Sequence, residues 1–518
     1  MDKPYLLALD YGTQSVRAIL FDTKGTLIHK AQISVEPFIE SQITNNPGSA
    51  EQHPEYCYAQ LVQVIKQLIS VNHIDTSMIS SLALTSQRSC TVLTDTQFQP
   101  VSPIYMWSDT RLADSCSLKP LSWYFRMAFS IVGMDKRIEF LRRSAKVNFL
   151  DQTQPSLLKN ADKVALFSGY LIQKMTGVAV DSVASQVAYL PFDYRKLTWA
   201  KSSSWRWEAL ACSQDQMMDL MPAAKVISKI DTKFCEDTGL HPEIVVATAG
   251  GDKACEMFAT GSGEVGIANI SLGSAACVSI GLKNYQESYR YMPPFPSIAE
   301  NQFMNEIQLE RGFWLLSWLI AEFGHEDKLT AAEQGKSVEA YICDKIVAIA
   351  PGADGLLLCP TWSQGVIYPG PEARGSIVGF TPKHTRFHMY RAAIEGVLFT
   401  LKAALIRLEK KHNYPVDVVR ISGGGSQSRQ VLKMAANILN KPVEVIDIGE
   451  ASALGAAMCA ATASGVFTDV YEARAAMMKV DRRINPEREE SLTYQQIFKS
   501  QSTIYNRVKP ILKALVEK

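Results

Sequence analysis

Near the middle of the chain, one aspartate stands directly after a pair of glycines. Asp252 follows Gly250 and Gly251, which end the apolar, strand-like run 244–249. Glycine lets the backbone pass close to a ligand, and a carboxylate on such a turn can accept the proton of a substrate hydroxyl. The segment predicts a glycine turn whose carboxylate acts on an alcohol.

Two further turns offer backbone N–H groups and hydroxyls. One covers residues 10–15 and follows the strand-like run 5–9. The other covers residues 271–274 and follows the run 265–270. Successive N–H groups in such turns form cradles for phosphate. Two phosphate turns with an acid between them in the sequence predict a phosphotransferase.

These turns contain candidates for both phosphate and metal binding. The expected ATP contacts are Gly12, Thr13, Gln14, Gly273 and Ser274. Asp10 is expected to hold hydrated Mg²⁺, an ion that prefers carboxylate oxygen and water. For Arg17, on the next strand, a contact with the transferred phosphoryl group and simple exposure are both left open.

A third glycine-rich turn, 423–428, follows the expected strand 416–421 and precedes an expected helix over 430–439. Nucleotide can lie against the backbone of such a turn and against the helix N-terminus. The turn is neither a Walker loop, because no Gly-Lys-Ser/Thr follows, nor a GxGxxG fingerprint. A nucleotide site and a plain strand-to-helix turn are both left open.

Two loops in the first half combine polar side chains with an aromatic ring. Gln87 and Arg88 follow an expected strand at 79–84, and Trp107 follows the run 103–106. A flat apolar surface and forked hydrogen bonding suit a polyhydroxylated ligand. We expect these three side chains to bind the substrate, with a core position as the alternative for Trp107.

The composition is that of an ordinary globular protein. With 518 residues, 47% apolar and 20% charged, the chain is expected to form two or three domains. Its net charge of +1 argues against a nucleic-acid partner held by bulk electrostatics. The ten cysteines include no Cys-x-x-Cys pair, so reduced thiols in a cytoplasm are expected.

No segment has the pattern of a membrane anchor. The N-terminus leads into a strand without an apolar signal segment. The most hydrophobic stretch, 123–134, contains Arg126 and is shorter than the ~20 residues that a spanning helix needs. We expect a buried or partner-facing helix there, and no membrane partner.

The order of expected elements indicates an α/β protein with a weak internal repeat. Short strands within 5–35 are followed by helices and strands in alternation to about residue 260. The second half restarts with strands at 265–270 and 275–280, followed by helices such as 388–408. We expect a domain boundary near 255–265 and a substrate cleft between the halves.

Taken in order, these segments resemble the FGGY family of carbohydrate kinases, which includes glycerol, xylulose, ribulose and gluconate kinases. The matching segments are 10–17, 251–252, 271–274, 375–380 with 388–395, and 423–425 through 455–457. They extend over essentially the whole chain, and their order makes an accidental coincidence negligible.

The resemblance implies an α/β fold of two actin-like (ribonuclease H-like) domains that flank a cleft. Residues 1–260 would form the sugar-binding side, and residues 261–518 the ATP-binding side with its C-terminal helices. By the same resemblance, Asp252 is the general base and Asp10 is the carboxylate on the Mg²⁺ side. The implied adenosine contacts are Gly424, Gly425 and Ser428.

Departures from the family pattern leave the substrate open. The pair Gln87-Arg88 is similar to that of glycerol kinases, but Ser89 stands where their acidic residue follows. The Met-His pair of xylulose kinases is absent. Lys253, which we expect to contact the substrate beside the base, replaces the Asn of xylulose kinases and the Gln of glycerol kinases.

We therefore expect a kinase that uses ATP and Mg²⁺ to phosphorylate a hydroxyl of a small, xylulose-like ketose or of a polyol. A glycerol- or erythritol-type polyol kinase is the nearest alternative. From other classes, a non-catalytic actin-like ATP-binding protein and an ATPase without a sugar are left open. The expected partner is the small sugar or polyol, and a homodimer is an open expectation.

Overall fold

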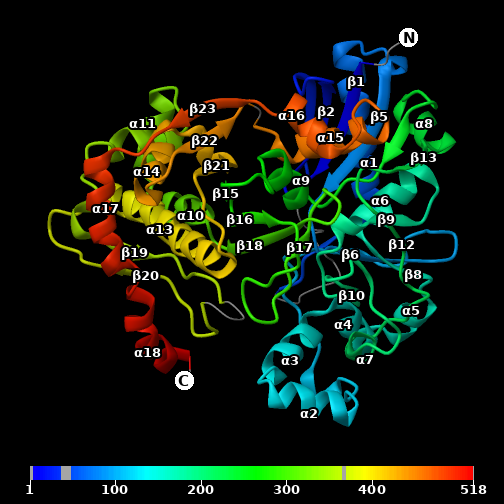
Figure 1. The fold of residues 1–518 in the computed structure, drawn as a ribbon, viewed down its shortest axis with the longest axis horizontal. Helices are drawn as coiled ribbons and strands as arrows, with labels where there is room; N and C mark the ends of the chain where they lie inside the picture. The colour runs from blue at the N-terminus through cyan, green and yellow to red at the C-terminus, as the bar shows by residue number, and fades with distance from the viewer. Residues whose placement is uncertain (1–3, 37–47, 365–368, 448, 517–518) are drawn as a thin grey trace.

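The computed structural model describes residues 4–36, 48–364, 369–447 and 449–516, and two sheets dominate it (Figure 1). Within these residues, six strands form the first sheet, in the order β13 (Val226–Lys229), β14 (Val245–Ala247), β5 (Ile79–Ser86), β1 (Tyr5–Tyr11), β2 (Ser15–Asp22) and β3 (Leu27–Ser34). Seven described strands form the second, in the order β17 (Phe295–Pro296), β18 (Phe303–Leu309), β16 (Ala276–Leu282), β15 (Ile267–Leu272), β21 (Val418–Ser422), β22 (Val443–Ile446) and β23 (Val480–Ile484). The fold is therefore α/β, with one sheet-based domain in each half of the chain.

Helices and smaller sheets surround these two sheets. The helices of the first half are α1 (Pro54–Asn72), α2 (Trp123–Ile131), α3 (Asp135–Ser144), α4 (Lys146–Thr153), α5 (Pro155–Asn160), α6 (Phe167–Thr176), α7 (Trp205–Ala209), α8 (Thr232–Thr238) and α9 (Asp252–Ala259). Those of the second half are α10 (Trp314–Phe323), α11 (His325–Glu333), α12 (Val338–Ile346), α13 (Arg386–His412), α14 (Arg429–Leu439), α15 (Ala451–Ala463), α16 (Val470–Met477), α17 (Arg488–Gln501) and α18 (Ile504–Val516). The smaller sheets pair β4 (Glu51–Gln52), β7 (Ile104–Tyr105), β6 (Thr91–Thr94) and β8 (Lys163–Leu166), β9 (Val180–Ser182) with β12 (Asp219–Met221), β10 (Phe192–Asp193) with β11 (Thr198–Trp199), and β19 (Leu357–Cys359) with β20 (Ser376–Val378).

In the first sheet, the central strand β1 is buried on both faces. Residues 6–9 are fully buried because α1 covers one face and α15 the other. β1 pairs in parallel with β5, which places Asp10 opposite Thr85. The carboxyl ends of these strands therefore meet at one edge, where the Gln87 N–H donates to the Tyr11 carbonyl at 3.0 Å.

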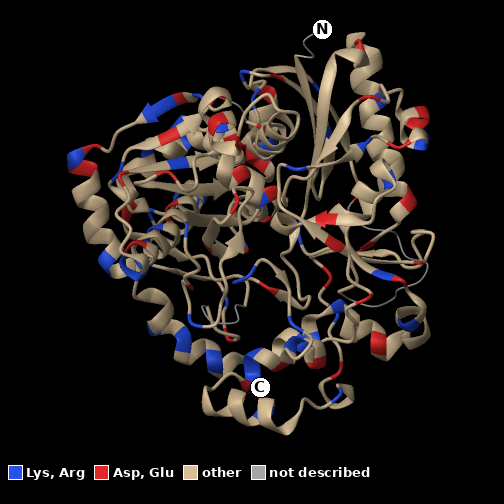
Figure 2. Ribbon diagram, turned by 45° about the vertical axis from the view of Figure 1, so that its right-hand side comes forward, with Lys and Arg blue, Asp and Glu red and all other residues tan. Residues whose placement is uncertain are grey.

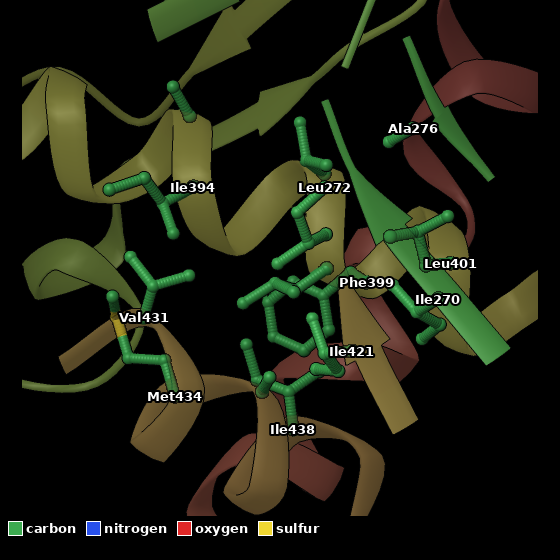
Figure 3. Close-up of a cluster of buried hydrophobic side chains, with 14 of the residues drawn as sticks. Ile270, Leu272, Ala276, Ile394, Phe399, Leu401, Ile421, Val431, Met434 and Ile438 are labelled. Atoms are coloured by element: carbon green, nitrogen blue, oxygen red, sulfur yellow. The ribbon is translucent and has the colours of Figure 1, made fainter. Parts of the chain in front are cut away.

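In the second sheet, β15 forms a hairpin with β16 and pairs in parallel with β21. Side chains of β15 and β21, such as Ile270 and Ile421, pack against Phe399 of α13 and Ile438 of α14 (Figure 3). This core fixes the carboxyl ends of β15 and β21 side by side, so the turns that follow them meet.

Two helices, α9 and α15, connect the halves. A Cβ at Gly455 of α15 would collide with the Cys255 carbonyl of α9, so glycine permits their close approach. Ser81 of β5 donates to the Ala460 carbonyl of α15 at 2.9 Å. Residues 451–463, which we expected to belong with the ATP-binding half, thus pack on the first sheet.

The structure refines several expected elements. Asp252 is not on an open turn: it is the first residue of α9, and Gly251 is the N-cap. The strand expected from residue 265 begins at Ile267, because Val265 is 92% exposed. The helix expected over 388–408 extends from Arg386 to His412.

The hydrophobic stretch 123–134 is not the buried helix that was one of its two expected positions. Its helix α2 has Trp123 exposed by 71% and Ile131 by 77%, whereas Phe129 packs its ring 5.2 Å from Trp205. The buried position is therefore wrong, and a partner-facing role stays a prediction. None of the helices in the described parts of the chain is long and apolar enough to cross a membrane. Charged residues of both signs occur on both halves (Figure 2).

Candidate active site

Asp252 lies where the two halves meet. Its helix α9 follows β14, and the bridge between Ser86 and Gly251 places the start of α9 beside the end of β5. A Cβ on Gly251 would lie 2.7 Å from Cγ of Arg88. The absence of a side chain at Gly251 therefore makes room for the Arg88 side chain beside Asp252.

The electrostatics around Asp252 suit a proton acceptor. Burial raises the pKa of its carboxyl group, and the cations of Arg88 and Lys253 oppose that rise. Nε of Arg88 lies 3.7 Å from Oδ1 of Asp252. A carboxylate with a raised pKa holds a proton more tightly than an ordinary one, which favours general-base catalysis near neutral pH.

Arg88 joins residues from both halves. Its Nη2 donates to Oε1 of Glu306 on β18 at 3.3 Å, and its guanidinium carbon lies 5.3 Å from the ring centre of Phe295 on β17. Burial opposes the charged form, but Glu306 and Asp252 outweigh it and raise the pKa of Arg88. The guanidinium therefore stays charged at the boundary between the halves.

A cluster of unsatisfied polar atoms surrounds this arginine. We call Ser86, Gln87, Arg88 and Glu306 the polar cradle. Among the described residues, its Ser86 Oγ, Gln87 Nε2, Arg88 Nη1 and Glu306 Oε2 are buried without a hydrogen-bond partner. Because an unpaired buried polar group is costly, such a concentration indicates that a ligand supplies the missing partners.

Trp107 and Thr13 extend this cluster. The Thr13 hydroxyl donates to Oε1 of Gln87 at 3.0 Å and accepts from Nε1 of Trp107 at 3.1 Å. The Trp107 side chain is 54% exposed, so its core alternative is wrong. Thr13, expected at ATP, is thus bonded to two of the residues expected at the substrate.

Lys253 makes its hydrogen bonds outside the polar cradle. Its Nζ donates to Oε2 of Glu256 at 2.6 Å and to the Ser271 hydroxyl at 2.8 Å. The Ser422 hydroxyl donates to the other Glu256 oxygen at 2.5 Å. The structure therefore places Lys253 in a network that ties α9 to the ends of β15 and β21, and its substrate contact stays a prediction.

Asp10 lies at the first phosphate turn, in a cluster of charged side chains in which Lys30 also pairs with Glu450 at 2.5 Å. Its Oδ2 accepts from Nη1 of Arg17 at 2.7 Å, and Glu450 lies 3.6 Å from the same nitrogen. Arg17 is thus held by two carboxylates. Burial raises the pKa of Asp10 to about 6 against the opposing effect of Arg17, and Asp252 contributes to the rise.

This carboxylate fits the Mg²⁺ expectation. In the described parts of the chain, no three His, Cys, Asp or Glu side chains converge to hold a metal by themselves. Mg²⁺ usually takes one or two carboxylates and completes its octahedron with water and substrate phosphates. A buried, ionisable Asp10 with Asp252 nearby matches that set of ligands.

The second and third turns lie against each other. Gly273 accepts from the Phe313 N–H at 3.0 Å, and Ser274 accepts from the Gly312 N–H at 2.8 Å. Gly423 has a φ of +84°, and a Cβ there would lie 2.8 Å from the Leu272 carbonyl carbon. Close approach of the two turns therefore requires glycine at this position.

The third turn leaves open space above its backbone. A Cβ at Gly424 would meet nothing within 4 Å, whereas one at Gly425 would lie 3.0 Å from the Phe313 ring. The Ser428 hydroxyl caps α14 by accepting from the Val431 N–H at 3.3 Å. A cavity of about 110 Å³ lies beside the turn, lined by residues that include Gly423, Ser426 and Asp447.

Sequence reasoning missed Glu306 and Phe295 of the site. Neither belongs to a motif, and their contact with Arg88 depends on how the two sheets meet. Glu256 was also missed, although its position three residues after Lys253 on one helix is a recognisable ion-pair spacing.

The comparisons with known proteins agree with this architecture. The model of the N-terminal domain of the FGGY family of carbohydrate kinases matches residues 5–259, and that of the C-terminal domain matches residues 268–464. A glycerol kinase from Desulforamulus reducens is 27% identical, with 93% of each chain covered. A xylulose kinase from Lactococcus lactis is 25% identical, with 99% of each chain covered.

A solved structure has the same fold. The ligand-bound xylulose kinase from Lactobacillus acidophilus superposes with a TM-score of 0.81 at 19% identity, over 98% of both chains. The two domain models together account for most of the chain and leave out residues 1–4, 260–267 and 465–518. This chain therefore belongs to the FGGY family of carbohydrate kinases and is a phosphotransferase.

Proposed function

We propose that the chain is a cytoplasmic kinase that transfers the γ-phosphate of ATP to a hydroxyl of a small ketose or polyol. Kinases of this family use ATP. The observation that carries the proposal is the polar cradle beside Asp252, with unsatisfied donors on Gln87 and Arg88 and an unsatisfied acceptor on Glu306. Sugar hydroxyls both donate and accept, so they can satisfy all of these atoms at once.

Asp252 would act as the general base in this reaction. It adjoins the polar cradle through Arg88, so a hydroxyl bound there has a proton acceptor within reach. Its raised pKa makes it a stronger acceptor than an ordinary carboxylate. The exposed Trp107 ring offers a flat surface for the carbon skeleton, and Thr13 keeps that ring oriented.

The turns at the carboxyl ends of β1, β15 and β21 would bind ATP. We expect the backbone N–H groups around Gly12 and Gly273 to contact the phosphates. The open space beside Gly424 supports a nucleoside position there. Asp10 would hold Mg²⁺, which neutralises charge on the phosphates when bound. Water must be kept from the phosphoryl group, so the halves are expected to close on the substrates.

For the substrate we propose one of two types of carbohydrate, a ketose or a polyol. A xylulose-like ketose is preferred, with a glycerol- or erythritol-type polyol as the alternative, since relatives of both kinds match at similar identity. Ser89 favours neither type, because it carries no charge and its hydroxyl already donates to the Val187 carbonyl at 2.5 Å.

The test is a coupled assay of ADP release with xylulose, ribulose, glycerol, erythritol and gluconate. We expect ADP release that depends on the added carbohydrate and is lost in Asp252→Asn. Equal ADP release without carbohydrate would identify an ATPase. ATP binding without turnover on any compound of the panel would identify a nucleotide-binding protein, and either result would contradict the proposal.

A further inference from the structure

We propose that Glu306 makes the substrate site select uncharged polyols and ketoses and reject sugar acids. The proposal rests on the proposed carbohydrate kinase function and specifies its substrate class. It follows from three features of the polar cradle: where Glu306 lies, how the charges around Arg88 add up, and which polar atoms lack a partner.

Glu306 is a buried carboxylate brought to the site by the second half. It lies on β18 opposite Ser279 of β16, and its side chain is only 2% exposed. Its Oε1 accepts from Arg88, whereas its Oε2 has no partner within the described residues. A carboxylate that is buried with one oxygen unpaired is expected to accept from a ligand donor.

One guanidinium here serves two carboxylates. Glu306 Oε1 lies 3.3 Å from Nη2 of Arg88, and Asp252 Oδ1 lies 3.7 Å from Nε. Other charges close by are already balanced, because Lys253 is paired with Glu256 at 2.6 Å. The buried thiol of Cys277 stays protonated, since burial raises its pKa. The site therefore carries one negative charge in excess.

A ligand carboxylate would add a further negative charge to this site. Like charges brought together away from water are strongly unfavourable. A carboxylate also has no proton to donate to Oε2 of Glu306, whereas a hydroxyl can donate to Glu306 and accept from Arg88 Nη1 or Gln87 Nε2. Charge and hydrogen bonding thus favour the same class, a neutral polyhydroxylated compound.

The experiment compares ligands that share a carbon skeleton and differ at one end, which is a carboxylate in the acid and a primary alcohol in the polyol. D-gluconate and D-glucitol share one carbon skeleton, as do D-xylonate and xylitol, and xylulose is included as a ketose. For wild type we expect kcat/KM for the neutral member of a pair to exceed that for the acid by roughly 100-fold or more. This comparison needs no variant.

Glu306→Gln then removes the charge and keeps the shape. The amide can donate to a ligand carboxylate, so we expect the preference for the neutral member to fall by roughly 10- to 100-fold, the range of a lost charge-assisted hydrogen bond. Glu444→Gln is the matched control. Glu444 is also a buried glutamate of the same sheet and is paired with Arg420 at 3.1 Å, but it lies outside the cradle. The Glu444→Gln substitution should lower the melting temperature and leave the preference for neutral ligands over acids unchanged.

The outcomes separate this inference from the function on which it rests. Wild type that uses gluconate or xylonate as well as the neutral partner overturns the role of Glu306 and leaves a carbohydrate kinase. So does a folded Glu306→Gln enzyme whose preference matches wild type. If Glu306→Gln does not fold, the wild-type comparison decides alone. No carbohydrate-dependent ADP release with any compound would overturn the proposed function, and this inference with it.

Discussion

Two buried arginine–glutamate pairs of this protein differ in how completely their polar atoms are hydrogen-bonded. Arg391 and Glu395 lie on α13, with Nε of Arg391 donating to Oε1 of Glu395 at 2.8 Å. The other two guanidinium nitrogens donate to the Ile346 and Ile349 carbonyls and to the Tyr494 hydroxyl. Both oxygens of Glu395 also accept from the Gly352 N–H.

The pair of Arg88 and Glu306 is incomplete by comparison. Within the described residues, each of its members keeps a buried polar atom without a partner, and so does the adjacent Gln87. A buried ion pair whose hydrogen bonds are all made joins elements of the fold, as Arg391 joins α13 to α17. One that leaves polar atoms unsatisfied needs further hydrogen-bond partners, and we propose that the sugar substrate supplies them here.

The largest effect is expected on kcat, at Asp252 beside the incompletely bonded pair of Arg88 and Glu306. Asp252→Asn keeps the shape of the side chain and removes the proton acceptor, so kcat should fall roughly 10²- to 10⁴-fold. The affinity for ATP should change little, because we propose that the carboxylate contacts the acceptor hydroxyl and not the nucleotide. Steady-state kinetics and nucleotide titration check both, and near-wild-type turnover would remove Asp252 from the mechanism.

At the satisfied pair, the expected effect is on stability. Arg391→Met leaves the buried Glu395 without its cationic partner, which should lower the free energy of unfolding by about 3–5 kcal/mol. Denaturant unfolding measures the loss. Exchanging both residues for Met should recover much of it, and KM for the sugar in the folded fraction should match wild type. A raised KM would mean that this pair also serves the site.

A smaller effect concerns the pH dependence of turnover. The rate should be lost as pH falls through the pKa of Asp252, because the protonated carboxyl cannot accept a proton. The cation of Arg88 lowers that pKa against the effect of burial. In Arg88→Met the pKa therefore rises, and the acid limb of kcat against pH should move to higher pH. Lys253→Met should move it less, and movement to lower pH in either variant contradicts the assignment.

The smallest effect is expected on the sugar KM, and it should distinguish two buried glutamines. Gln87 has an unpaired amide nitrogen, so Gln87→Ala should raise the sugar KM roughly 2- to 10-fold, the range of one neutral hydrogen bond. Gln186 donates to Asp181 and to the Ser182 carbonyl. Gln186→Ala should therefore lower the melting temperature without changing KM. Equal sugar KM values for both variants would contradict the inference that the unpaired nitrogen of Gln87 binds the sugar.

The sequence predicts the parts of this site that depend on local structure. The turns after β1, β15 and β21 follow from an apolar strand that ends in glycine, and that pattern is visible within a few residues. The turns after β15 and β21 meet because these two strands pair in parallel, whereas the turn after β1 belongs to the other sheet. The start of α9 at Asp252 was missed because Gly251, read as part of a turn, is in fact its N-cap.

Contacts between the halves depend on packing and were not predictable in this way. Glu306 lies on a strand with no motif around it, and only the fold brings it to Arg88. The direction of Lys253 follows from its bond to Ser271 across the same boundary. The exposure of Trp123 depends on which neighbours cover α2, and an apolar run alone does not specify them.

The most direct test of the sugar site is a pair of titrations on Arg88→Met, one with the preferred sugar at saturating ATP and one with ATP at saturating sugar. Methionine keeps much of the apolar stem beneath Gly251 and removes the guanidinium. We expect the sugar KM to rise roughly 10- to 100-fold, as for a lost charge-assisted hydrogen bond, while the ATP KM stays close to wild type. An unchanged sugar KM with a raised ATP KM would place Arg88 on the nucleotide side and contradict the polar cradle as the sugar site.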